Sequence, residues 1–167
     1  MDDDTVIATY DQARFKLDAD VRRCWAFKGS PPIVYKNGSK IAINIGGTYT
    51  STGEFHFYKM KYQIKEEVLL NIKLLRIKYP KMFFLLDKAS WNKNKIVIGY
   101  FDRNKIPYMF YPTGASDLNA TEECWRQTRE NVTANKSHNS EKELFANLKS
   151  YWSKNPFKHN MLNYLSP

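Results

Sequence analysis

Two aspartates occupy positions where carboxylates can take part in chemistry. Asp11 closes the apolar run TVIATYD, and Asp87 closes the apolar run MFFLLD. Both runs have the composition of buried strands, and the ligand sites of α/β sheets gather at the carboxyl ends of strands. An ionised carboxylate there is costly unless a cation or hydrogen-bond donors compensate its charge. One such aspartate usually caps a turn or the next helix, whereas two together favour a metal site.

A third acidic position, Glu122, follows the loop PTGASDLN at the expected start of a helix. One interpretation is structural: Asn119 is the N-cap, and Glu122 at the third helical position is its capping partner. The other is chemical, because Glu122 shares a helical face with Arg126 and Arg129. A carboxylate beside arginines suits a site that holds both metal and phosphate. The residue types alone leave both interpretations open.

The elements that must position these side chains begin with strands. Residues 5–60 contain apolar, partly alternating runs separated by turn residues, so we expect a meander of three or four antiparallel strands there. The runs are TVIATYD, RFKL, CWAFKG, KIAINIGGTYTS and GEFHFYKM, and KGSPP breaks the pattern after the third.

Helical spacing then replaces alternation. Apolar residues recur on one face of a predicted amphipathic helix, and a proline ends it: Val68, Ile72, Leu75, Tyr79 and Pro80. Residues 81–87 predict a central strand, 92–104 a weaker helix and 106–112 another strand. Two further helices begin near residue 119 and at the capping box Ser140–Glu143. This order predicts an α/β sheet with an antiparallel half and a parallel half.

The composition is typical of one folded domain, with 167 residues, 43% of them hydrophobic and 26% charged. No apolar run approaches the roughly 20 residues that a spanning helix needs, and the N-terminus is acidic, unlike a secretory signal. We therefore expect an intracellular protein with no membrane partner. Cys24 and Cys124 lack the paired spacing of a zinc site, and we expect both to be small buried side chains.

The net charge of +9 is concentrated in one region. Residues 59–105 hold 12 Lys and Arg against 4 Asp and Glu, whereas residues 1–58 hold 7 of each sign. Such a field suits a polyanion partner, because each neutralised phosphate releases counterions. A solvated Lys-rich surface explains the composition equally well. In the same way, Lys93 and Lys95 around Trp91 could grip DNA or form a basic helix face in water.

Four segments occur in order across nearly the whole chain: YDQARFKL, CWAFKGSPP, LLDKASWNK and DLNATEECW. They resemble, respectively, the Asp-Glu-x-x-Phe strand, the W-x-x-K-G-x-x-P hairpin, the strand ending Asp-Asn-Ala-x-x-His and the L-N-P-x-E-x-x-W segment of one family. That family is the bacterial and archaeal insertion-sequence transposases of the mariner-like superfamily. Thirty-four residues separate Asp87 from Glu122.

The resemblance implies a ribonuclease-H-like fold, in which helices flank a mixed five-stranded sheet made of an antiparallel meander and parallel strands. It implies that Asp11, Asp87 and Glu122 form a D-D-E triad holding two Mg²⁺ or Mn²⁺ ions, hard cations that match carboxylate oxygens. Such ions activate an attacking water or DNA 3′-hydroxyl and stabilise the departing oxygen. The implied activity is DNA cleavage and strand transfer, with Glu123 as the solvent-facing neighbour of Glu122.

DNA is the partner that the resemblance implies, and we expect the basic residues near the triad to contact it: Lys88, Lys93, Lys95, Arg126 and Arg129. The sequence departs from the family's motifs at four positions, where an acid, Asn, His and Pro are replaced by Gln12, Lys88, Asn92 and Ala120. These departures bear on activity more than on fold. A decayed DNA-binding or assembly module and a stand-alone nuclease are the alternatives to a transposase.

Family members carry helix-turn-helix segments before the catalytic domain, whereas Asp11 follows Met1 by only ten residues. We therefore expect a single catalytic domain over residues 1–167, without specific recognition of transposon ends. The candidate protein partners are a second copy in a homodimer and a separate N-terminal DNA-binding chain. The expected location is cytoplasmic and nucleoid-associated.

Overall fold

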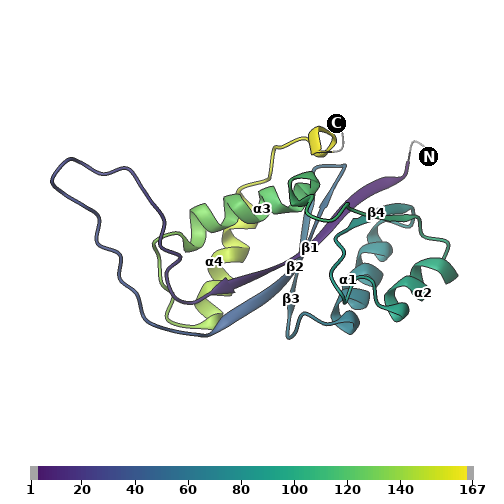
Figure 1. Ribbon diagram of the computed structural model, residues 1–167, viewed down its shortest axis with the longest axis horizontal. Coiled ribbons are helices and arrows are strands. Elements are labelled where there is room, and N and C mark those ends of the chain that lie inside the picture. Colours follow the sequence, from purple (N-terminus) through teal and green to yellow (C-terminus); the bar gives the residue numbers. More distant parts are fainter. Residues whose placement is uncertain (1–3, 165–167) are drawn as a thin grey trace.

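The computed structural model describes residues 4–164, and the first three residues of the acidic N-terminus and residues 165–167 lie outside that range. Its centre is a five-stranded sheet in the order β3-β2-β1-β4-β5 (Figure 1). β1 pairs antiparallel with β2 and parallel with β4, and the outer pairs continue these directions. The strands are β1 (Val6–Lys16), β2 (Ala42–Thr50), β3 (Phe55–Met60), β4 (Met82–Leu86) and β5 (Tyr108–Phe110). The predicted mixed sheet is confirmed.

Helices cover both faces of the sheet (Figure 1). α1 (Lys65–Lys78) and α2 (Lys95–Arg103) lie on one face, and α3 (Ala120–Thr128) and α4 (Glu141–Lys154) on the other. The short helices are η1 (Ser116–Leu118), the π-helical η2 (Arg129–Thr133) and η3 (Met161–Tyr164). β1 is buried on both faces, because Ala8 and Tyr10 point into the core under α1 and Ala13 and Phe15 into the core under α3.

The predicted helices form where their periodicity places them. Val68, Ile72 and Leu75 are the buried apolar residues of α1. At the start of α4, the Ser140 side chain accepts a hydrogen bond from the Glu143 backbone N–H at 3.1 Å. The Glu143 carboxylate accepts from the backbone N–H of Asn139, one residue before the N-cap, so the predicted capping box is closed in a shifted form.

Two expectations for the first 60 residues are wrong. The runs TVIATYD and RFKL form one strand, because β1 stays paired with β2 from Ala8 to Lys16. Residues 24–29 form no strand and make no strand pairing in the described part of the chain. Asp11 therefore lies inside a strand, although β4 leaves β1 just before it, at the pair Tyr10–Leu86.

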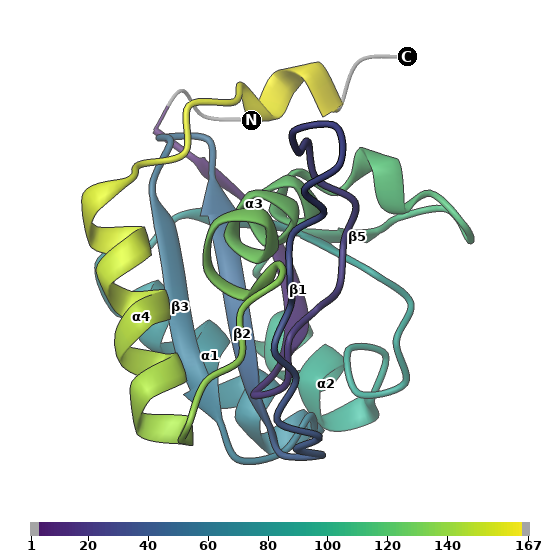
Figure 2. The same ribbon diagram turned by 90° about the vertical axis from the view of Figure 1, so that its left-hand side faces the viewer.

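Residues 21–41 form a long arm between β1 and β2 that projects from the body (Figure 1) and points toward the viewer in Figure 2. Its large apolar side chains lie in solvent, including Trp25, Phe27, Ile33 and Tyr35. Cys24 is exposed on this arm, contrary to expectation. Cys124 is buried in α3 as expected. None of the described helices has the length and apolar character needed to cross a bilayer.

Candidate active site

Three carboxylates that are far apart in sequence line one pocket of about 300 Å³, which we call the carboxylate pocket. Tyr10 of β1 is paired with Leu86 of β4, and because the two strands are parallel, the next residue of each, Asp11 and Asp87, reaches the same edge. Glu122 comes from the first turn of α3, which packs on β1. Thr121 fixes that turn, because its hydroxyl donates to the Thr9 carbonyl of β1 at 2.6 Å.

Asp11 is the most enclosed of the three, with 8% of its surface exposed. Its Oδ2 accepts a hydrogen bond from the indole Nε1 of Trp125 at 3.0 Å. Burial, together with the negative charges of Glu122 and Asp87, raises the pKa of Asp11 to about 7. The pocket therefore concentrates negative charge that a cation would stabilise.

Asp87 is held in place through a single oxygen. Its Oδ1 accepts from the side-chain amide of the buried Asn92 at 2.6 Å and from the backbone N–H of Ala89 at 3.0 Å. Within the described residues, no donor reaches its Oδ2. Asn92 stands where the family resemblance places a histidine, and it orients this carboxylate while leaving one oxygen for a ligand.

The contacts of Glu122 exclude the capping-box interpretation of the start of α3. Asn119 is the N-cap, since its side chain accepts from the Thr121 backbone N–H at 3.1 Å. The Asn119 backbone N–H donates to the Ser116 carbonyl, so Glu122 does not complete a capping box. No side chain or backbone group in the described part of the chain donates to the Glu122 carboxylate, which lines the carboxylate pocket instead.

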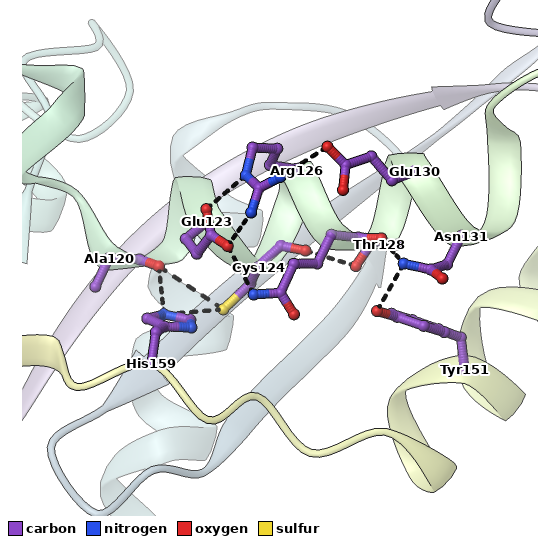
Figure 3. Close-up of polar contacts among 10 residues, drawn as sticks. Ala120, Glu123, Cys124, Arg126, Thr128, Glu130, Asn131, Tyr151 and His159 are labelled. Carbon is purple, nitrogen blue, oxygen red and sulfur yellow. Dashed lines mark hydrogen bonds and ion pairs between the residues drawn. The ribbon is translucent and has the colours of Figure 1, made fainter. Parts of the chain in front are cut away.

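Glu123 is not the solvent-facing neighbour that was expected. Its side chain is 17% exposed and accepts two hydrogen bonds from Arg126, at 2.5 and 2.7 Å, and one from Gln127. Arg126 also pairs with Glu130 at 2.7 Å (Figure 3). The hydrogen bonds from Arg126 hold the pKa of Glu123 below its usual value. Of the two adjacent acids, Glu122 therefore has no partner among the described residues, whereas Glu123 is fully paired.

A tryptophan and a glycine support the site, and neither residue was predicted to have this role. Gly47 of β2 lies opposite Asp11 in β1. A Cβ atom at Gly47 would lie 2.3 Å from the Trp125 ring, so the missing side chain makes room for the indole that holds Asp11. The only signals in the sequence were the tryptophan three residues after Glu122 and the Gly46-Gly47 pair in a strand, a pattern that indicates close approach of another group.

The C-terminal segment also supports α3. The imidazole of His159 lies against the Ala120 carbonyl at 3.0 Å and close to the Cys124 thiol (Figure 3). The ring of His159 stacks on Tyr49 of β2, with centroids 4.2 Å apart. The turn that carries Glu122 is therefore held between β1 and this segment.

The five basic residues expected to contact DNA lie in different surroundings. Lys88 lines the carboxylate pocket, with Nζ 3.4 Å from the Thr113 hydroxyl. Lys93 and Lys95 are exposed. Arg126 is occupied by Glu123 and Glu130, whereas Arg129 lies over the Phe15 ring at 5.6 Å, beyond the pocket.

The donor set suits hard divalent cations. Carboxylate oxygens are the preferred ligands of Mg²⁺ and Mn²⁺, and three carboxylates share this pocket. The buried hydroxyl of Tyr111 also lines it and has no hydrogen-bond partner among the described residues. As the side chains stand, no group of three or more His, Cys, Asp or Glu in residues 4–164 is positioned to hold a metal ion. Ion binding therefore requires the carboxylates to draw together.

A family model described as DDE superfamily endonuclease matches residues 6–145. The chain belongs to this family. No curated protein matches it. Among solved structures, a pre-cleavage Mos1 transpososome is similar, with a TM-score of 0.71 and 10% identity over 95% of this chain and 51% of that one. The mariner Mos1 paired end complex with Mn gives a TM-score of 0.67 and 12% identity over 95% and 50%.

The catalytic core domain of BIV integrase is also similar, with a TM-score of 0.57 and 14% identity over 95% of this chain and 93% of that one. These likenesses confirm the ribonuclease-H-like fold that the motifs predicted. The DDE chain spans about half the length of the Mos1 chains.

Proposed function

We propose that this chain is the catalytic domain of a mariner-like DNA transposase that cuts and joins phosphodiester bonds at the pocket of Asp11, Asp87 and Glu122. The observation that carries the proposal is the meeting of these three carboxylates in one pocket, in a chain of the DDE endonuclease family. Glu122 lies in the pocket without a protein partner among the described residues, as a metal ligand would before its ion arrives.

Asp11, Asp87 and Glu122 would hold two Mg²⁺ or Mn²⁺ ions, which supply charge stabilisation to an in-line displacement at phosphorus and activate the attacking oxygen. Two of the Mos1 matches are complexes with Mn and with Mg. The protein's own part is to hold the carboxylates in place. Trp125 donates to one oxygen of Asp11 and Asn92 to one oxygen of Asp87, so these bonds orient both carboxylates and leave the other oxygen of each for an ion.

DNA is the proposed substrate and partner. Lys88 lines the pocket and would contact a phosphate beside the reacting one, and the exposed Lys93 and Lys95 would extend the positive surface over residues 59–105. Contacts to phosphates without contacts to bases give affinity without sequence preference, so a separate chain would supply recognition of specific ends. A nucleoid-associated location follows from this substrate.

A homodimer is the proposed assembly, and the arm is the surface that supports it. Trp25, Phe27, Ile33 and Tyr35 present apolar area that a monomer leaves in water. The similar structures include Mos1 paired-end complexes. Sedimentation should show self-association of the wild type at high protein concentration that is lost when Trp25 and Phe27 are both replaced by Ser. A monomeric wild type with or without DNA would contradict the dimer.

A decayed module that binds DNA without cutting it is the second candidate. The observation in its favour is Lys88, whose ammonium group lines the carboxylate pocket and could take the place of a cation. In that case the fold and the DNA affinity persist, and neither metal binding nor cleavage occurs.

The deciding experiment is a nicking and joining assay on labelled DNA ends with Mn²⁺. We expect Glu122→Gln to abolish both reactions and Glu123→Gln to leave them nearly intact, because only Glu122 lines the carboxylate pocket without a partner. The variant Asp87→Asn should also be inactive. Two results would contradict the catalytic proposal without affecting the fold. One is full activity of Glu122→Gln, and the other is an inactive wild type when a DNA-binding partner chain is supplied. Nicking without joining would indicate a nuclease.

A further inference from the structure

A second concave surface lies beyond the carboxylates, where β1 ends. It is a cavity of about 510 Å³ between the last residues of β1, the segments at the two ends of the arm (residues 18–20 and 36–40) and η2. Five basic side chains line it, and we call it the basic groove: Arg14, Lys16, Lys36, Lys40 and Arg129. We propose that the basic groove binds the phosphodiester backbone of DNA, about three to five base pairs from the bond cut at the carboxylate pocket. This inference rests on the proposed function.

The two acids of the groove do not neutralise it. The Asp18 carboxylate accepts the backbone N–H groups of Ala19 and Asn37, at 2.9 and 3.0 Å, and lies 3.6 Å from Lys36. Asp20 pairs with Arg22 at 3.1 Å, outside the groove. Both carboxylates therefore already have hydrogen-bond or ion-pair partners in the arm or next to it.

Four cations remain without an acidic partner. In the described part of the chain, no carboxylate lies within 4.0 Å of the charged groups of Arg14, Lys16, Lys40 or Arg129. Arg129 rests on the Phe15 ring, which fixes its position without compensating its charge. Arg126, one helical turn earlier, has two acidic partners. A set of unpaired cations around one concavity is suited to an anion.

The course of β1 connects the groove to the carboxylate pocket. β4 pairs with β1 only up to Tyr10, so from Gln12 to Lys16 no strand among residues 4–164 lies along that edge of β1. Asp11 stands where this free edge begins. Arg14 and Lys16 alternate along β1 with Phe15, and all three line the groove.

The lengths of β1 and of α3 independently give similar separations between the carboxylate pocket and the basic groove. At about 3.3 Å per strand residue, Arg14 lies roughly 10 Å from Asp11 and Lys16 roughly 17 Å from it. At about 1.5 Å per helical residue, Arg129 lies roughly 10 Å along α3 from Glu122. One DNA strand advances about 3.4 Å per nucleotide along the axis, so these lengths correspond to roughly three to five nucleotides.

The spread of the cations indicates a chain of phosphates rather than a single one. Arg14 and Lys16 are two strand residues apart, and Lys40 and Arg129 come from the arm and η2. One small anion would reach one or two of these groups, whereas a nucleic acid strand presents a negative charge at every step. The groove would then fix the direction of the strand leaving the carboxylate pocket.

The test is the salt dependence of DNA binding, measured without metal by fluorescence polarisation on a labelled 20-base-pair duplex. The groove variant is the pair Lys16→Gln and Lys40→Gln. The matched control is the pair Lys154→Gln and Lys158→Gln, which removes the same charge from exposed lysines outside the groove. Each lost phosphate contact lowers the slope of log K against log salt by about 0.9, so we expect the groove variant to lose about 2 and the control nothing. Equal slopes for both variants would overturn the inference.

A second measurement locates the contact. A pool of duplexes, each with one neutral methylphosphonate linkage, is nicked in Mn²⁺ and the products are sequenced. We expect neutral linkages three to five nucleotides from the nick to lower cleavage by the wild type and to have no effect on the groove variant. Interference at the same positions in both proteins would contradict the inference. A wild type that never nicks, combined with the loss of salt slope in the groove variant, would remove the proposed function and leave the groove as a DNA site.

Discussion

The buried charge of Asp11 predicts that removing it stabilises the metal-free protein. The pKa of Asp11 is about 7 in the folded chain, against an ordinary value of 3.8. Between these values the unfolded state loses the proton and the folded state keeps it, so the free energy of unfolding falls as pH rises. The loss is about 1.4 kcal/mol per pH unit, on the order of 4 kcal/mol in total, and it is complete above pH 7.

Asp11→Asn should remove this loss, because the amide oxygen can still accept from Trp125 Nε1 while carrying no charge. The assay is urea unfolding in EDTA, followed by tryptophan fluorescence, at pH 5 and pH 8. Relative to the variant, the wild type should lose on the order of 3 kcal/mol between these two values. The exposed Asp102→Asn serves as control and should follow the wild type. Added Mn²⁺ should stabilise the wild type at pH 8 and not Asp11→Asn.

The reasoning is refuted if the wild type and Asp11→Asn show the same change in the free energy of unfolding between pH 5 and pH 8. It is also refuted if the variant is less stable at pH 8, since that would mean that the carboxylate contributes more through its hydrogen bond than it costs through burial and repulsion.

Three other changes test the support of the site. Gly47→Ala should destabilise the protein by about 1–3 kcal/mol in urea unfolding, because the new methyl group meets the Trp125 ring; an unchanged midpoint would contradict the packing. Trp125→Phe should weaken Mn²⁺ affinity about 10- to 100-fold in calorimetry by freeing Asp11, and equal affinity would deny the tryptophan this role. Asn92→Ala should lower Mn²⁺ affinity, because Asp87 loses the amide that orients it. The loss in Mn²⁺ binding free energy should be larger than the loss in the free energy of unfolding measured in urea.

Local signals in the sequence predicted the elements well. The N-caps of α3 and α4, the buried stripe of α1 and the short apolar strand β4 all depend on residues within a few positions of one another. The length of β1 was missed because its second half is a strand only by virtue of its pairing with β2, whose residues 42–47 come after the arm. The motif W-x-x-K-G-x-x-P does not indicate by itself that residues 24–29 leave the sheet.

The sequence predicted which carboxylates belong to the candidate site, but it did not predict the residues that hold them. The resemblance to the transposase family implied Asp11, Asp87 and Glu122 as a triad, whereas the residue types alone left Glu122 open between a cap and a ligand, and Asp11 lies inside β1 rather than at its end. The hydrogen bond from Trp125 to Asp11 joins residues 114 positions apart, and the space at Gly47 exists only in the packed structure. Arg126 could have paired with Glu122 or with Glu123, and in the structure it pairs with Glu123.

The most direct measurement of the central claim is the anomalous scattering of a crystal soaked in Mn²⁺ at pH 8. The proposed function predicts manganese density in the carboxylate pocket, between Asp11 and Asp87 and within bonding distance of Glu122, and its loss in a crystal of Asp87→Asn soaked in the same way. An empty pocket in a wild-type crystal soaked in saturating Mn²⁺, with the Lys88 ammonium group lying between the carboxylates, would contradict it.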